Sequence, residues 1–253
     1  MDAQILTLLS DPETHEALEF RPDALVNMRS GKRYPIRDGI PDFLEKVSGQ
    51  NEKYQALYDR IAVFYDLSEK VYRWLKRKQD FRRAFIDELE VRSRARVLEV
   101  SVGTGANLRY LPSDIAFFGL DVSWGMLRQC RKNLWKWNRT AELFHGEAEH
   151  LPFREGVFDV VFHVGGINFF NDKAGAIQEM TRVAKSGTKI VIVDETEKVV
   201  KEQYERTPFI GKYFKKRADA VTDPSILVPG SMREVSCRQI VDGKAYCLTF
   251  RKP

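Results

Sequence analysis

The chain has 253 residues, of which 43% are hydrophobic, 11% aromatic and 30% charged, and this composition excludes an intrinsically disordered, collagen-like or low-complexity protein. Its formal net charge of +5 permits nucleic acid, phosphorylated metabolites or a membrane surface as partners without selecting one of them. No apolar run approaches the ~18 residues of a membrane span, and the first residues lack the basic start of a signal peptide, so the sequence predicts a cytoplasmic protein.

Three cysteines, at positions 130, 237 and 247, lie far apart and show no Cys-x-x-Cys spacing. We therefore expect neither a disulfide framework nor a cysteine zinc site, and we predict that the thiols are reduced. A chain of this length buries a substantial hydrophobic core without such cross-links.

Short strand-like runs alternate with turns between residues 5 and 44, a segment that is too small for a core of its own. The predicted strands are 18–20, 32–36 and 40–44. From residue 51 to 91 the pattern becomes helical, since Phe81, Phe85 and Leu89 recur at i, i+4 and i+8. This spacing predicts two or three amphipathic helices that pack on the rest of the chain.

Five apolar, β-branched runs then alternate with helical segments. Continuous apolar strands separated by helices indicate a parallel sheet that is covered on both faces and built by right-handed crossovers. Met126 and Cys130 belong to the apolar stripe of the helix between the second and third runs, and Gly187 is predicted to end a later helix as its C′ residue. The runs are 96–100, 116–121, 141–145, 157–162 and 189–194.

After these runs comes a basic segment, residues 198–217. Two further runs, 233–241 and 245–250, are joined by Asp242-Gly243, the strongest short hairpin signal in the sequence. We therefore predict an α/β fold: a Rossmann-like, doubly wound sheet of seven strands that is closed by an antiparallel C-terminal hairpin, with a small β-rich segment before it.

The sharpest local feature is the glycine loop Ser101-Val102-Gly103-Thr104-Gly105, which joins the first run to a predicted helix. Glycine lets the backbone approach a ligand closely, and a helix N-terminus offers unpaired N–H groups. The loop therefore indicates a nucleotide-like ligand at the carboxyl edge of the sheet, although a Gly-x-Gly pattern alone also fits a purely structural turn.

Polar residues at the ends of other runs add to this signal. Asp121 ends the second run, 22 residues beyond Glu99, at a place where a carboxylate can accept hydrogen bonds from both ribose hydroxyls. Glu147 and Ala148 follow the third run, and His163 ends the fourth. Because the carboxyl ends of parallel strands meet at one edge, all five residues are predicted to lie around one ligand.

Two departures narrow the class of ligand. Leu108 stands where the dinucleotide fingerprint has its third glycine, which argues against a nicotinamide dehydrogenase. No Gly-Lys-Ser/Thr sequence follows the loop, so a P-loop is excluded. Glu99 would repel a pyrophosphate, and it suits a ligand that carries an ammonium group.

With these motifs in order, the chain resembles the class I S-adenosylmethionine-dependent methyltransferases, and among them the ubiquinone and menaquinone biosynthesis group (methyltransferase type 11). The resemblance covers residues 96–194, in which 97–108 match the family's first motif, 119–123 its second and 146–153 its third. It implies a methyl transfer with S-adenosylmethionine as cofactor and S-adenosylhomocysteine as product, and it says little about the acceptor.

The resemblance also implies roles for single residues. Glu99 is expected to face the methionine ammonium, Asp121 to hold the ribose, and Glu147 to read the adenine edge. Ser101 departs from the family by replacing its usual first glycine. Tyr65 lies in a stretch similar to the helix that folds over the cofactor, where it would either hydrogen-bond the cofactor carboxylate or simply pack. The predicted cofactor-binding residues are Tyr65, Glu99, Ser101, Gly103, Gly105, Asn107, Asp121, Val122, Met126, Glu147, Ala148 and His163.

Residues 1–48 resemble the small zinc-ribbon-like module of Trm112-type proteins. They carry none of the paired cysteines of such modules, so we predict no metal here and expect a structural or substrate-shaping role. The remaining domain, 49–253, is predicted to contain a helical lid, a cofactor-binding core, and a substrate-side helix with the closing hairpin. The boundaries of these parts are 49–93, 94–195 and 196–253.

Methyl transfer is an in-line displacement of a good leaving group, so the protein mainly has to align the acceptor and exclude water. His163 is the candidate general base because it is expected near the methyl group and its ordinary pKa is near neutrality. The alternative is that His163 only supports the loop 164–168. The fourth run is followed by no Asn/Asp-Pro-Pro-Tyr motif, which argues against methylation of an exocyclic base nitrogen.

The leading hypothesis is a methyltransferase that acts on oxygen or carbon of a small-molecule or lipid-like acceptor. An RNA methyltransferase is an alternative, suggested by the pI of about 9.0 and by basic runs such as 73–78 and 215–217. A non-catalytic S-adenosylmethionine-binding module is another, and peripheral membrane contact through 198–217 is a further hypothesis; the oligomeric state stays open. The aromatic residues predicted to line an acceptor pocket, or else to be simple core, are Phe169, Phe170, Phe209, Tyr213 and Phe214.

Overall fold

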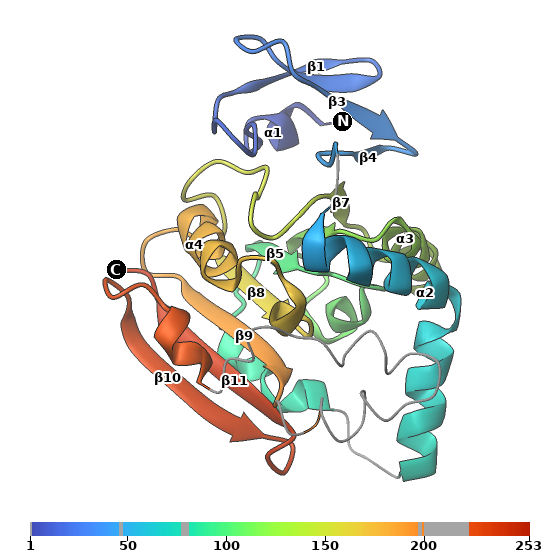
Figure 1. The fold of residues 1–253 in the computed structure, drawn as a ribbon, viewed down its shortest axis with the longest axis vertical. Coiled ribbons are helices and arrows are strands. Elements are labelled where there is room, and N and C mark those ends of the chain that lie inside the picture. The colour runs from blue at the N-terminus through green and yellow to red at the C-terminus, as the bar shows by residue number, and fades with distance from the viewer. Residues whose placement is uncertain (1, 46–47, 77–80, 197–198, 200–222) are drawn as a thin grey trace.

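The computed structural model describes residues 2–45, 48–76, 81–196, 199 and 223–253, with only the backbone described for 63–76 and 81. Its larger sheet has the strand order β10-β11-β9-β8-β5-β6-β7 (Figure 1). Neighbours from β9 through β7 run parallel, whereas β11 is antiparallel to both β9 and β10. This arrangement confirms the predicted seven-stranded, Rossmann-like sheet with a closing hairpin. The strands are β5 (Arg96–Val100), β6 (Ala116–Asp121), β7 (Glu142–His145), β8 (Val160–Val164), β9 (Lys189–Glu195), β10 (Arg233–Ile240) and β11 (Ala245–Arg251).

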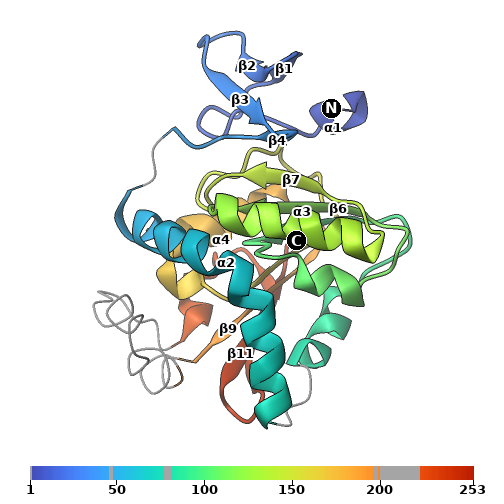
Figure 2. The ribbon, with the colours of Figure 1, turned by 90° about the vertical axis from the view of Figure 1, so that its right-hand side faces the viewer.

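Both faces of this sheet are covered, which explains the continuous apolar runs in its sequence. On β5, Val97 packs in one core cluster with the apolar stripe of helix α3 (Trp124–Trp137). Its neighbour Leu98 points to the other face and packs in a cluster with helix α4 (Lys173–Val183). Figures 1 and 2 show α3 and α4 on opposite sides of the sheet. Since successive strand residues face opposite ways, a strand covered on both sides has to be apolar throughout.

The N-terminal segment folds as a four-stranded antiparallel sheet that begins after a short helix. Three of its strands were predicted, and β2 was missed because its four residues are all buried and show no alternation. Leu9, Tyr34 and Phe43 join the same core cluster as α4, so the segment shares its core with the main domain. The elements are α1 (Ala3–Leu6), β1 (Leu18–Arg21), β2 (Ala24–Asn27), β3 (Arg33–Arg37) and β4 (Ile40–Pro41).

The end of the N-terminal sheet extends the larger sheet at its β7 edge. Asp42 forms a parallel bridge with His145, and the backbone N–H of Phe43 donates to the His145 carbonyl at 2.9 Å. Figure 2 shows β4 directly above β7. The contact satisfies backbone groups of an edge strand that would otherwise lie open to pairing with other chains.

The region between 49 and 91 differs from the prediction of two or three amphipathic helices. One long helix, α2 (Gly49–Lys76), is followed by two short 3₁₀ helices, η1 (Phe81–Ala84) and η2 (Ile86–Leu89). The i, i+4 spacing was misleading because Phe85 has a non-helical backbone, and the tighter turns still bury Phe85 and Leu89 in the core.

Two further helix predictions need correction. The glycine loop opens only the five-residue 3₁₀ helix η3 (Ala106–Tyr110), so no long helix begins at this loop. Gly187 is not the C′ residue of α4, because that helix ends at Val183 and Ala184 is already extended. Ala184 forms a parallel bridge with Phe158, and this tertiary pairing ends the helix earlier than the glycine indicates.

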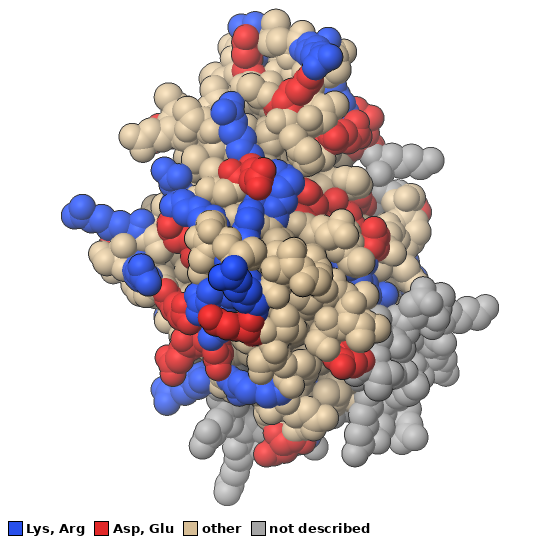
Figure 3. All heavy atoms as spheres, turned by 90° about the vertical axis from the view of Figure 1, so that its left-hand side faces the viewer, with Lys and Arg blue, Asp and Glu red and all other residues tan. Residues whose placement is uncertain are grey.

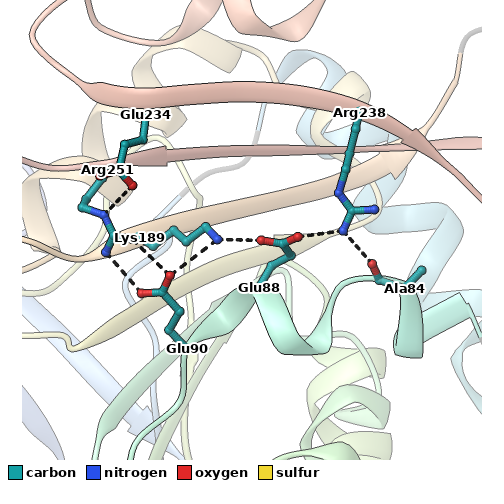
Figure 4. A network of polar contacts seen from close by, with 7 residues as sticks. All are labelled: Ala84, Glu88, Glu90, Lys189, Glu234, Arg238 and Arg251. Carbon is teal, nitrogen blue, oxygen red and sulfur yellow. Dashed lines mark hydrogen bonds and ion pairs between the residues drawn. The ribbon is translucent and has the colours of Figure 1, made fainter.

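A network of ion pairs joins the η2 turn to the last three strands of the sheet (Figure 4). Lys189 at the start of β9 pairs with Glu88 at 2.6 Å, and Arg238 of β10 pairs with the same carboxylate at 2.8 Å. Arg251 of β11 binds Glu90 at 3.0 Å. The groups are partly exposed, so the network contributes modestly to the free energy of unfolding and mainly fixes where the η2 turn lies.

The surface and the helices bear on two partner hypotheses. On the face drawn in Figure 3, Lys and Arg side chains lie beside Asp and Glu rather than forming a wholly basic area. Among the described residues, no helix combines the length and the apolar character that crossing a membrane requires. The basic segment 198–217, which suggested nucleic acid or membrane contact, lies almost entirely outside the described residues.

Candidate functional site

The loop after β5 is built from residues in the left-handed region of backbone space. Ser101, Gly103 and Gly105 have φ values of 61°, 54° and 76°. Ser101 thus has a backbone conformation that favours glycine, at a cost of about 1–2 kcal/mol. A Cβ atom on Gly105 would lie 2.7 Å from the Cys130 sulfur, whereas one on Gly103 would meet nothing within 4 Å. Gly105 thus lets the loop pack on α3, and Gly103 leaves space beside the loop.

Glu99 is a fully buried acid near the end of β5. Its Oε1 accepts a hydrogen bond from Asn107 Nδ2 at 2.6 Å, and Arg82 Nε donates to Asn107 Oδ1 at 2.7 Å. Its Oε2 has no hydrogen-bond partner among the described residues. Burial raises the pKa of Glu99 to about 8, against the opposing effects of the Asn107 hydrogen bond and the Arg82 charge. A cationic group next to Oε2 would satisfy this atom and stabilise the carboxylate.

Asp121 ends β6, next to the glycine loop. Its Oδ2 accepts from the Gly103 backbone N–H at 2.8 Å, and its Oδ1 accepts from the Ser123 N–H at 2.9 Å. Burial raises the pKa of Asp121 to about 6, while these two hydrogen bonds and the nearby His145 oppose the rise. The carboxylate is thus fixed in orientation, and each oxygen keeps a lone pair for a hydroxyl of a ligand.

A third acidic residue follows strand β7 at the same edge. Glu147, two residues after the end of β7, accepts a hydrogen bond from Asn51 of α2 at 3.1 Å. Burial raises the pKa of the Glu147 carboxyl as well. Ala148, the residue after Glu147, is buried. Met126 is buried near the start of α3, and Val122, between β6 and α3, is half-buried.

Helix α2 lies across this edge and contacts the residues between β6 and α3. Gln55 Nε2 donates to the Val122 carbonyl at 2.8 Å. Asp59 Oδ1 accepts from the Ser123 hydroxyl at 2.6 Å and from the Gly125 N–H at 2.7 Å. The sequence analysis missed these residues. Asn51, Gln55 and Asp59 recur at i, i+4 and i+8, so a polar stripe along one helix face was the signal that could have found them.

His163 is fully buried near the end of β8, and its Nδ1 lies 2.9 Å from the Val100 carbonyl oxygen. A carbonyl only accepts, so Nδ1 carries the hydrogen and Nε2 keeps its lone pair. Nε2 has no hydrogen-bond partner among the described residues. Burial lowers the pKa of His163, while the charge of Asp194 opposes this. The neutral form, which can accept a proton, is therefore favoured.

The loop after β8 is held by Asp194, which the sequence analysis did not single out. Its carboxylate accepts from the Gly166 N–H at 3.1 Å and from the Asn168 N–H at 3.2 Å. Phe169 packs on Tyr54, with ring centroids 4.2 Å apart, and Phe170 packs edge-on against His163. The loop is thus supported by Asp194 rather than by a hydrogen bond from His163.

The structure brings most of the predicted site residues to one edge. Direct hydrogen bonds join Asn107 to Glu99 and Gly103 to Asp121. The side chain of Tyr65, within α2, lies outside the described part of the chain, as do Phe209, Tyr213 and Phe214. In the described residues, no group of three or more His, Cys, Asp or Glu side chains is arranged to hold a metal ion.

These residues fit a ligand with an ammonium group and a ribose. The unsatisfied Glu99 oxygen suits the ammonium, and the oriented Asp121 carboxylate at the next strand suits the two hydroxyls. The space beside Gly103 allows a ligand to lie against the loop backbone between them.

Comparison with known proteins finds similarity to methyltransferases. Residues 98–192 match the family model described as a methyltransferase domain. The demethylmenaquinone methyltransferase of Lactiplantibacillus plantarum is 31% identical over 150 residues, covering 56% of this chain and 62% of the relative. That of Renibacterium salmoninarum is 30% identical over 140 residues, covering 55% and 57%. The matches thus span less than two thirds of these relatives.

Among solved structures, an S-adenosylmethionine-dependent methyltransferase from Aquifex aeolicus shares the fold, with a TM-score of 0.54 and 16% identity over 67% of this chain and 88% of that one. Residues 98–192 are thus similar to a methyltransferase domain, and the chain shares its fold with S-adenosylmethionine-dependent methyltransferases of known structure. S-adenosylmethionine is the cofactor of this domain class. The likeness of residues 1–48 to Trm112-type modules stays a prediction.

Proposed function

We propose that the protein transfers the methyl group of S-adenosylmethionine to oxygen or carbon of a small-molecule or lipid-like acceptor. The observation that supports this most is the buried Glu99 Oε2 without a partner, one strand away from the fixed Asp121 carboxylate. The relatives named as demethylmenaquinone methyltransferases add support for a lipid-like acceptor. No observation on the described residues favours an RNA acceptor or a non-catalytic module.

Three acidic residues would hold the cofactor, each at a different strand end. Glu99 would bind the methionine ammonium, Asp121 the ribose hydroxyls, and Glu147 the adenine edge, with Val122 and Met126 against the ring. Gly103 and Gly105 would pass beneath the cofactor, with Ser101 and Asn107 at the two ends of the loop. Helix α2 would act as a lid, since Asn51, Gln55 and Asp59 already contact this edge. Ala148 and Tyr65 are further proposed cofactor contacts.

His163 is the proposed general base. S-adenosylmethionine, when bound, supplies an electrophilic methyl group on a sulfonium. The Nε2 lone pair of His163 would take the proton from an acceptor hydroxyl or an acidic carbon, while Nδ1–H stays bound to the Val100 carbonyl and holds the ring in place. Phe170 next to the ring would help to exclude water from this proton transfer.

Residues 1–48 would act as a structural module fused to the methyltransferase domain of residues 49–253. The module contacts the last residue of β7, two residues before Glu147.

Transfer of labelled methyl groups tests the proposed function. The protein is incubated with methyl-labelled S-adenosylmethionine and either demethylated quinone lipids, bacterial small-molecule extract or total RNA. Label is expected in the quinone or small-molecule fraction, and it should disappear with Asp121→Ala. His163→Gln should retain S-adenosylhomocysteine binding and lose most of the transfer, about 10²–10⁴-fold if it is the base. Label found only in RNA would overturn the proposed acceptor class.

A further inference from the structure

A chain of hydrogen bonds runs from the N-terminal segment to the cofactor edge of the sheet. It begins at Asp42, just after β4, whose Oδ1 lies 2.7 Å from His145 Nδ1. The other ring nitrogen of His145, Nε2, lies 2.9 Å from the Val122 carbonyl oxygen. Both side chains of the pair are only 4% exposed. The contact is therefore a buried connection between two parts of the chain that are about a hundred residues apart in sequence.

The two partners of His145 define its protonation. A carboxylate and a carbonyl both only accept hydrogen bonds, so each ring nitrogen has to carry a hydrogen for both contacts to form. The ring is then an imidazolium, and the buried Asp42 carboxylate is its counter-ion. Arg37 Nε lies 3.5 Å from the second oxygen of Asp42, so a second positive charge lies beside this carboxylate.

The peptide group between Val122 and Ser123 carries the chain onward. Its carbonyl accepts from His145 on one side and from Gln55 of α2 on the other. Its N–H donates to Asp121 Oδ1 at 2.9 Å. Hydrogen bonds to the carbonyl of a peptide polarise its N–H, so this donor is both fixed in place and strengthened.

We propose that Asp42 is a positioning residue for Asp121, to which it is joined through His145 and this one peptide group. The proposal rests on the proposed function, because it assumes that Asp121 binds the ribose. The N-terminal segment would thereby take part in cofactor binding, because its Asp42 carboxylate is the counter-ion of the buried His145, which is joined to the ribose-binding Asp121.

The charges around this chain of hydrogen bonds from Asp42 to Asp121, which we call the relay, support this role. His145 opposes the burial-driven rise in the pKa of Asp121, and it also opposes the rise in the pKa of Glu147. The other ionisable groups near Asp121 are Asp59 of α2, which raises its pKa, and Glu99 of β5, which interacts with it. The positive charge of His145 thus opposes the effect of burial on Asp121 and favours its carboxylate form.

The test measures S-adenosylhomocysteine affinity by calorimetry between pH 5.5 and 8.5 in the full chain. Asp42→Asn keeps the shape of the side chain and removes its charge. It should weaken binding about five- to tenfold at pH 6.5 and less than about twofold at pH 8, because Asp121 becomes protonated at a higher pH. His145→Gln, which keeps an N–H donor without a charge, should give the same shift.

Tyr34→Phe is the matched control, since it removes a buried hydrogen bond to Asp11 within the same segment and leaves the relay intact. It should lower the melting temperature without moving the pH midpoint of binding. Nitrogen NMR of labelled histidine should detect hydrogens on both ring nitrogens of His145 in the unmodified protein. If Asp42→Asn and His145→Gln leave affinity unchanged, or lower it equally at every pH, the relay is overturned. Absence of binding by the unmodified protein at pH 8 would instead contradict the proposed function.

Discussion

Two buried acids at neighbouring strand ends set the chemistry of the site at the scale of single residues. Glu99 lies in β5 and Asp121 ends β6, and burial raises the pKa of each carboxyl, to about 8 and about 6. Asp121 is compensated by two backbone N–H groups, whereas Glu99 has one amide partner and one unsatisfied oxygen. The difference predicts that ligand binding changes the protonation of Glu99 more than that of Asp121.

Proton release tests the role of Glu99. In the free protein at pH 7, a carboxyl with a pKa of about 8 is mostly protonated. An ammonium group bound next to it favours the carboxylate, so S-adenosylhomocysteine binding should release close to one proton. Calorimetry at pH 7 in phosphate and in Tris, whose ionisation heats differ, measures this release. Glu99→Gln should bind at least about tenfold more weakly and release none; equal proton release in both proteins would refute the assignment.

The same residue makes a prediction for stability. The pKa of Glu99 is higher in the folded than in the unfolded chain, so its stabilising contribution is present at low pH and is lost as pH rises from about 4.5 through about 8. Glu99→Gln removes this dependence. Thermal unfolding should therefore find the variant's stability, relative to the unmodified protein, improving from pH 5 to pH 8.5; a constant difference would contradict the burial of an unpaired acid.

The two glycines of the loop have separable roles. Gly105→Ala places a Cβ atom 2.7 Å from the Cys130 sulfur at a positive φ, so it should destabilise the fold by about 2–4 kcal/mol. Gly103→Ala meets no neighbouring atom and should cost about 1–2 kcal/mol through its φ alone, yet weaken S-adenosylhomocysteine binding. Urea unfolding and calorimetry separate the two. Cys130→Ala should partly rescue Gly105→Ala but not Gly103→Ala.

At the scale of elements, the N-terminal segment is held by two similar turns that join through their side chains. Asp11 Oδ1 accepts from two backbone N–H groups, of Glu13 and Thr14, and Asn27 Oδ1 accepts in the same way from Arg29 and Ser30. Asn27 Nδ2 then donates to Asp11 Oδ2 at 2.8 Å. This polar pair connects the start of the segment to the end of β2 without cysteines.

Removal of the Asp11 carboxylate should loosen this segment. Asp11→Ala leaves the Tyr34 hydroxyl and two backbone N–H groups without their acceptor and removes one acceptor of Asn27 Nδ2, so we expect a loss of about 2–4 kcal/mol in the free energy of unfolding. Glu19→Ala, on the exposed side of β1, is the control and should change it by less than about 0.5 kcal/mol. Equal effects of both variants in urea unfolding would contradict the role of the pair.

At the scale of the whole molecule, local sequence predicted where β5 begins and ends, but it did not predict features that depend on long-range contacts. The run 96–100 is apolar because both faces of β5 are covered, so its bounds were predicted as the structure has them. Glu99 and Asp121 stood out because acids are rare in or next to such strands. By contrast, the early end of α4 depends on a bridge between Ala184 and Phe158, which no local pattern encodes.

The polar residues that support the site depend on the same long-range contacts. Arg82 is joined to Glu99 through Asn107, and Asp42 meets His145 across two sheets, so neither could be paired from spacing. His163 could be placed at a strand end, but its tautomer follows from the carbonyl of a neighbouring strand. The sequence thus predicted which strands carry the candidate site, and the tertiary structure determines how each group is oriented.

The central claim is that Glu99 and Asp121 together bind an adenosyl amino acid at the carboxyl edge of the sheet. Calorimetric titration of the full chain with S-adenosylhomocysteine tests it most directly. We predict one site per chain, and a loss of affinity of at least about tenfold with Asp121→Ala at pH 8. Absence of binding heat together with an unchanged melting temperature at saturating ligand, or equal affinity in the two proteins, would contradict the account.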